Sequence, residues 1–125
     1  MLRCLDHQAI SMSSVSFATL SLRPELLASI AALAYESMTP VQAQALPHLL
    51  NGKDLIAQAK TGSGKTAAFS LPVMNKLIYD YQRPSPNKPK VLILAPTREL
   101  VMQIGQFIDT FSRGTPLKSL VVAGG

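Results

Sequence analysis

The chain has 125 residues, 47% hydrophobic and 15% charged, which is enough for one domain with a core and excludes an intrinsically disordered chain. The formal net charge of +5 favours a polyanionic partner, and the single cysteine, Cys4, excludes an intrachain disulfide bond. Because no apolar run reaches membrane-spanning length, we expect a cytoplasmic protein that has no membrane partner.

The N-terminal part of the chain predicts a leader followed by a helix. Residues 1–16 show no periodicity and form the expected leader, in which Met12 is as natural a start as Met1. The first helix begins at Pro24, where the missing N–H of proline costs nothing. Its apolar face is expected to comprise Leu26, Leu27, Ile30 and Leu33.

A capping box predicts the start of the next helix. Thr39 is the N-cap, proline follows it, and Gln42 stands at the third helical position. Pro47 is expected to bend or restart this helix before the turn at residues 51–52.

Residues 59–66 fit the phosphate-binding loop pattern except at the first position, which is alanine. The flanking segments support this assignment, because 54–58 predicts a buried strand and a helix opens at Thr66. Gly62 and Gly64 allow backbone N–H groups to point at a polyphosphate, Lys65 reaches its outer phosphates, and Thr66 is placed to ligate Mg²⁺. The alternative is a Gly/Ser/Thr turn that precedes a helix. The expected nucleotide contacts are Ala59, Lys60, Thr61, Gly62, Ser63, Gly64, Lys65 and Thr66.

The remaining elements alternate between helix and strand. The helix after the loop carries an apolar stripe and a distorting Pro72, and Tyr79 and Tyr81 favour packing at its end over a platform for base stacking. The segments 91–95 and 117–123 predict strands, with a helix opening at Pro96-Thr97-Arg98 between them. The stripe consists of Phe69, Val73 and Leu77, and the buried face of the last helix of Leu100, Val101, Ile104, Ile108 and Phe111. We therefore predict an α/β fold with a parallel sheet flanked by helices.

Several stretches together resemble the DEAD-box RNA helicases. Residues 34–42, with Phe17 upstream, resemble the family's Q motif, residues 96–100 resemble motif Ia, and Gly124-Gly125 resembles its glycine pair. Alanine at position 59 is usual in this family. The resemblance covers residues 17–125 and implies that they form part of a RecA-like domain. It also implies that ATP and Mg²⁺ are the cofactors and that the activity is that of an ATP-dependent RNA helicase. Within the family, the loop variant and residues 41–50 resemble bacterial helicases that act on ribosomal RNA.

The resemblance also implies roles for individual residues. Gln42 would hydrogen-bond the adenine edge, Phe17 would stack on the base, and Thr39 would hold Gln42. Lys65 and Thr66 would be the catalytic residues of this part. The expected contacts to the RNA sugar-phosphate backbone are Pro96, Thr97, Arg98, Gly124 and Gly125, none of which would read sequence. Ala34 and Met38 depart from the pattern, because the family often has glycine and proline there.

Each of these motifs can also be explained by local secondary structure alone. Thr39 and Gln42 are also explained as a capping box, residues 96–98 as the end of a strand and start of a helix, and Gly124-Gly125 as a turn.

No Asp-Glu-Ala-Asp motif occurs, so the chain resembles roughly the first third of a helicase core without its second RecA-like domain. The alternatives are therefore a non-catalytic nucleotide- or RNA-binding fragment, or another P-loop enzyme such as a small-molecule kinase. The latter leaves the Q-type and Ia-type stretches unexplained.

Overall fold

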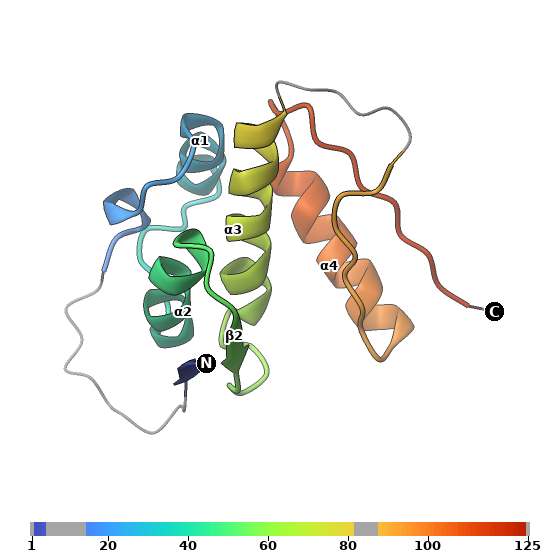
Figure 1. Cartoon of the computed structure of the whole chain (residues 1–125), viewed down its shortest axis with the longest axis horizontal. Coiled ribbons are helices and arrows are strands. Elements are labelled where there is room, and N and C mark those ends of the chain that lie inside the picture. Colours follow the sequence, from blue (N-terminus) through green and yellow to red (C-terminus); the bar gives the residue numbers. More distant parts are fainter. Residues whose placement is uncertain (1, 5–14, 82–87, 125) are drawn as a thin grey trace.

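The computed structural model describes residues 2–4, 15–81 and 88–124 (Figure 1). Its elements, in chain order, are β1 (Leu2–Cys4), the 3-10 turn η1 (Phe17–Thr19), α1 (Pro24–Ala32), α2 (Pro40–Leu50), β2 (Leu55–Ala57), α3 (Lys65–Asp80) and α4 (Arg98–Phe111). Within these ranges, none of the helices combines the length and the apolar character needed to cross a bilayer.

The helix α3 occupies the centre of the molecule, with α1 and α2 on one side and α4 on the other (Figure 1). Its buried stripe includes Leu71, Met74 and Ile78, one turn apart, rather than the expected residues 69, 73 and 77, which are only partly buried. Apolar side chains from all four helices meet around this stripe. The core cluster consists of Phe17, Leu22, Leu26, Ile30, Met38, Leu46, Ala67, Leu71, Met74, Ile78 and Phe111.

The helix starts lie where the sequence predicts them, because each is specified by neighbouring residues. Pro24 opens α1, the capping box at Thr39 opens α2, and the hydroxyl of Thr97 accepts a hydrogen bond from the Leu100 N–H at the start of α4. Pro47 does not restart α2, which continues as one helix to residue 50.

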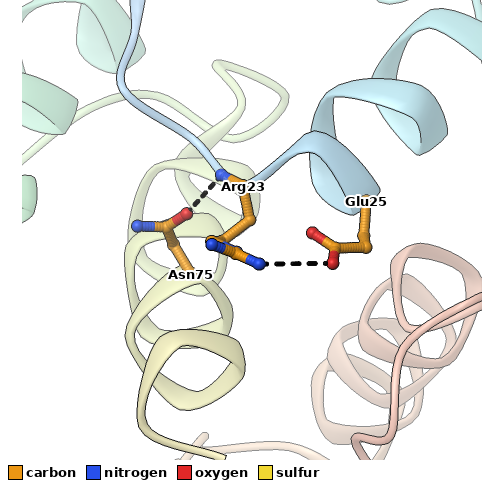
Figure 2. Close-up of polar contacts among 3 residues, drawn as sticks. All are labelled: Arg23, Glu25 and Asn75. Carbon is orange, nitrogen blue, oxygen red and sulfur yellow. Dashed lines mark hydrogen bonds and ion pairs between the residues drawn. The ribbon is translucent and has the colours of Figure 1, made fainter.

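A side chain of α3 holds the beginning of α1. The Arg23 backbone N–H donates to Oδ1 of Asn75 at 2.6 Å, and the Arg23 guanidinium lies 3.5 Å from the Glu25 carboxylate (Figure 2). Arg23 is the N-cap of α1 and makes no side-chain cap of its own. Asn75 therefore ties the first turn of α1 to the middle of α3.

The predicted three-stranded parallel sheet is wrong for this structure. Of the expected strands, only residues 55–57 form a ladder, and they pair in parallel with β1, with Leu2 opposite Leu55 and Cys4 opposite Ala57. The segments 91–95 and 117–123 have no strand pairing and run beside α4 (Figure 1). The second segment packs through a side chain, since Val121 fills the space over Gly105 of α4. In residues 117–123, this side-chain contact with the helix is found where a sheet would need backbone pairing.

The unpaired segments leave large apolar side chains in solvent. Leu92 and Leu94 are 81% and 83% exposed, and Leu120 and Val122 are 87% and 76% exposed. The unbroken apolar runs were expected to be covered on both faces, as in a central parallel strand. In this structure neither face of the two runs is fully covered.

Candidate nucleotide-binding and RNA-binding sites

Two glycines shape the loop between β2 and α3. Gly62 and Gly64 have φ angles of 82° and 89°, in the left-handed region that a side chain disfavours. Gly64 is the N-cap of α3, so the loop ends at Gly64 and the helix begins at Lys65. The first N–H groups of a helix lack intrahelical partners, and its dipole favours an anion at this end. The backbone therefore has the geometry of an anion cradle.

The polar side chains of the loop are placed for a ligand. The Lys65 ammonium donates a hydrogen bond to the Ala59 carbonyl, which holds it across the loop. The Ser63 hydroxyl oxygen is buried and has no partner among the described residues. Thr66, partly buried on the first turn of α3, has a hydroxyl that likewise makes no hydrogen bond within the described ranges. One ammonium and two unpartnered hydroxyls suit a phosphate with its metal ion.

The capping box forms as predicted at the start of α2. The Thr39 backbone N–H donates to Oε1 of Gln42 at 2.9 Å, and the Gln42 N–H lies 3.5 Å from the Thr39 hydroxyl. Gln42 is only 2% exposed, which is unusual for a glutamine and requires that its amide be satisfied.

The second half of the Gln42 amide reaches the phosphate loop. Its Nε2 donates to the Gly64 carbonyl at 3.1 Å, so both ends of the amide are engaged. A Cβ atom at Gly64 would overlap this amide and crowd the Thr39 hydroxyl. The sequence assigned Gly64 only to the turn of the loop. Its contact with Gln42 joins residues 22 positions apart, and no local sequence pattern predicts such a contact.

Phe17 lies in the core. It is 2% exposed, and its ring meets the Tyr35 ring edge-on at a centroid distance of 6.5 Å. Its side chain is therefore packed among apolar groups rather than presented beside the loop in this structure.

The residues expected at the RNA contact meet at the start of α4. The Arg98 guanidinium donates to the Gly124 carbonyl, and Thr97 caps the helix beside it. Pro96, Thr97, Arg98 and Gly124 are all exposed, whereas Gly125 lies outside the described residues. The structure thus brings together two segments that the sequence separates by 26 positions, and leaves them accessible to a ligand.

No group of three or more His, Cys, Asp or Glu side chains that could hold a metal ion occurs within the described ranges.

Comparison with known proteins decides the family. The profile of the DEAD/DEAH box helicases matches residues 39–125, which include the capping box, the phosphate loop and the start of α4. The chain belongs to this family. It is 46% identical over 110 residues to an ATP-dependent rRNA helicase of Meyerozyma guilliermondii, covering 88% of this chain and 22% of the relative. It is also 46% identical over 98 residues to the ATP-dependent RNA helicase DeaD of Escherichia coli, covering 78% of this chain and 15% of that protein.

Solved helicase structures share the fold. The ADP-bound RNA helicase Prp28 of Chaetomium thermophilum matches with a TM-score of 0.78 and 37% identity, over 91% of this chain and 27% of that one. A DEAD box protein of Methanococcus jannaschii matches with a TM-score of 0.71 and 34% identity, over 82% and 27%. The fold is therefore that of part of a RecA-like helicase domain. The chain spans between about a seventh and a quarter of the length of these helicases.

Proposed function

We propose that this chain supplies the ATP-binding part of a DEAD-box ATP-dependent RNA helicase. The observation that carries the proposal is the hydrogen bond from the Gln42 amide to the Gly64 carbonyl. It joins a buried side chain with one donor and one acceptor, the pattern that an adenine edge requires, to the loop that suits its phosphates.

In this proposal, Lys65, Thr66 and the backbone N–H groups of the loop hold the phosphates and the metal ion. The Lys65 ammonium leaves the Ala59 carbonyl for the outer phosphates, where its charge is better matched. The N–H groups of the loop and of the first turn of α3 hold the remaining phosphate oxygens. Mg²⁺, when bound, neutralises phosphate charge, and Thr66 is the side chain that would hold it.

The base site uses Gln42 and Thr39. The amide of Gln42 exchanges its partners at Gly64 and Thr39 for the adenine edge, while the Thr39 hydroxyl keeps the cap. Stacking of Phe17 on the base requires that its ring leave the core beside Tyr35.

The RNA site lies at the start of α4. Arg98 and the backbone near Thr97, with Pro96, Gly124 and Gly125, contact the sugar-phosphate backbone and read no sequence. One relative is an rRNA helicase, which supports ribosomal RNA as the substrate class. We place this activity in the cytoplasm.

Titration of a fluorescent ATP analogue with Mg²⁺ into the wild-type chain and Lys65→Ala tests the proposal. We expect at least a tenfold loss of affinity in the variant, because the charge facing the phosphates is gone. Lys53→Ala, which removes an exposed lysine outside the loop, is the matched control and should bind as wild type. Equal affinities for Lys65→Ala and wild type would overturn the nucleotide site.

A further inference from the structure

The turn that follows α4 is held in one shape by its own polar groups. The Ser112 carbonyl accepts hydrogen bonds from the Thr115 N–H at 3.0 Å and from the Thr115 hydroxyl at 2.6 Å. The same hydroxyl accepts from the Leu117 N–H at 3.3 Å. Because Thr115 already satisfies the carbonyl at the end of the helix, no cation is needed there as a cap.

This turn borders a hollow of about 450 Å³ at the end of α4. The Ser119 hydroxyl donates to Oδ1 of Asp109 at 2.6 Å, which ties the chain beyond the turn to the last turn of the helix. The 14 residues of α4 place this end about 21 Å from Arg98, so the hollow is separate from the sites already described. Its lining residues are Asp109, Ser112, Arg113, Leu117, Lys118 and Ser119.

The polar groups of the hollow suit an anion. Arg113 and Lys118 are exposed and form no ion pair within the described ranges. The Ser112 hydroxyl oxygen is buried and has no hydrogen-bond partner in the part of the chain that the structure describes. Asp109 is the one acidic residue of the lining, and it is engaged with Ser119. Two positive charges against one negative charge favour an anion, and the hydroxyl leaves a donor available to it.

The tyrosines at the end of α3 are not part of this hollow. Tyr79 is 70% exposed and Tyr81 is 48% exposed, so the expectation that they pack at the helix end is wrong. Neither lines the hollow, and side chains two positions apart on a helix point to different faces. The ligand of the hollow is therefore recognised by its charge, without a platform for stacking.

We propose that this hollow binds a phosphate group of the RNA backbone and forms a second RNA contact of the chain. The Arg113 guanidinium and the Lys118 ammonium hold the phosphate oxygens, and the Ser112 hydroxyl donates a further hydrogen bond. The inference rests on the proposed function, in which Arg98 at the other end of α4 contacts the same backbone. A strand that reaches both ends of the helix gains affinity over a strand that reaches one.

The salt dependence of RNA binding tests the two cations. For an oligouridine of about 12 nucleotides, Arg113→Gln/Lys118→Gln should lower the slope of log affinity against log salt by about 0.7, the share of one phosphate on a single strand. The affinity itself should fall about tenfold. The matched control Lys53→Gln/Lys90→Gln removes the same two charges from exposed positions outside the hollow and should keep the slope. Equal slopes in the two double variants would overturn the proposal.

Two single substitutions separate RNA binding from folding. Ser112→Ala removes a hydroxyl that has no partner, so the free energy of unfolding should stay the same or rise while RNA affinity falls about threefold. Asp109→Asn keeps an oxygen that can accept from Ser119 but loses the negative charge, so RNA affinity should rise about twofold. Unchanged affinity in Ser112→Ala, or a fall in Asp109→Asn, would rule out the phosphate contact.

Inorganic phosphate separates RNA from a free anion. Both inorganic phosphate and the oligouridine should shift the backbone amide NMR signals of residues 112–119. Shifts with inorganic phosphate alone would show a site for a free anion and overturn the RNA contact. Arg98→Ala should also weaken oligouridine binding. If it has no effect while Arg113→Gln/Lys118→Gln does, the contact proposed at Arg98 fails and the hollow stands, whereas the reverse result removes the hollow alone.

Discussion

Gln42 and Gly64 lie 22 positions apart in the sequence and are joined by a hydrogen bond of 3.1 Å from the side-chain amide to the backbone carbonyl. The same amide accepts from the Thr39 N–H at 2.9 Å. One buried side chain thus couples the start of α2 to the N-cap of α3. A substitution of Gln42 should therefore change both the free energy of unfolding and the conformation of the phosphate loop.

Two alanine substitutions separate the cap from base recognition. Thr39→Ala removes the capping hydroxyl and should lower the free energy of unfolding by about 1 kcal/mol, but it leaves the backbone N–H that orients Gln42. Gln42→Ala removes the amide itself, so preference for ATP over GTP should shrink in addition. Thermal melting and nucleotide titration of both variants check this. If the preference survives in Gln42→Ala while stability falls, Gln42 is a cap and nothing more.

The two loop glycines form a matched pair. Both have positive φ, but a Cβ at Gly64 would overlap the Gln42 amide, whereas a Cβ at Gly62 meets nothing within 4 Å. Gly62→Ala should therefore cost only the backbone strain, about 1 kcal/mol. Gly64→Ala should cost more and also displace Gln42. Chemical denaturation measures the difference, and equal losses for the two variants would show that the Gln42 contact does not constrain the loop.

Local signals made much of this fold predictable. The caps at Thr39 and Thr97 and the proline at position 24 specify helix starts through residues within one turn. Whether a segment forms a strand depends on which other segment lies next to it in the fold. The apolar run 91–95 does not indicate which segment would pair with it. The prediction therefore found β2 but missed β1, and it gave the segments 91–95 and 117–123 a pairing that this structure lacks. Similarly, the motif identified Gln42 and Gly64 separately, while only the fold shows that they touch.

The turn after α1 contains backbone strain. Ala34 has φ of 57° and is the only described residue other than glycine with positive φ. Ala34→Gly should raise the free energy of unfolding by about 0.5–1 kcal/mol, because glycine adopts this conformation without steric cost. Ala31→Gly, an exposed change inside α1, should lower it by a similar amount. Denaturation midpoints of the two variants should therefore move in opposite directions.

The unpaired apolar segments predict self-association. Leu94 is 83% exposed, so Leu94→Lys should change the free energy of unfolding by less than about 0.5 kcal/mol. It should nevertheless reduce both the binding of a dye that reports apolar surface and the fraction of sedimenting aggregates. Leu46→Lys, in which the substituted leucine is 0% exposed, should unfold the chain. Identical aggregation of wild type and Leu94→Lys would show that this segment is covered in solution.

A polypeptide of these 125 residues should bind ATP without hydrolysing it at a detectable rate. The loop and Lys65 hold phosphates, but hydrolysis also needs a group that positions the attacking water and a cation that stabilises the charge developing on the transferred phosphoryl group. No Asp-Glu-Ala-Asp carboxylate is present to do the first, and Arg98, the cation at the start of α4, is engaged with Gly124 rather than with the loop. Phosphate release with and without RNA, against Lys65→Ala as the control, measures this. RNA-stimulated turnover that disappears in Lys65→Ala would mean that the residues present already assemble a complete catalytic site.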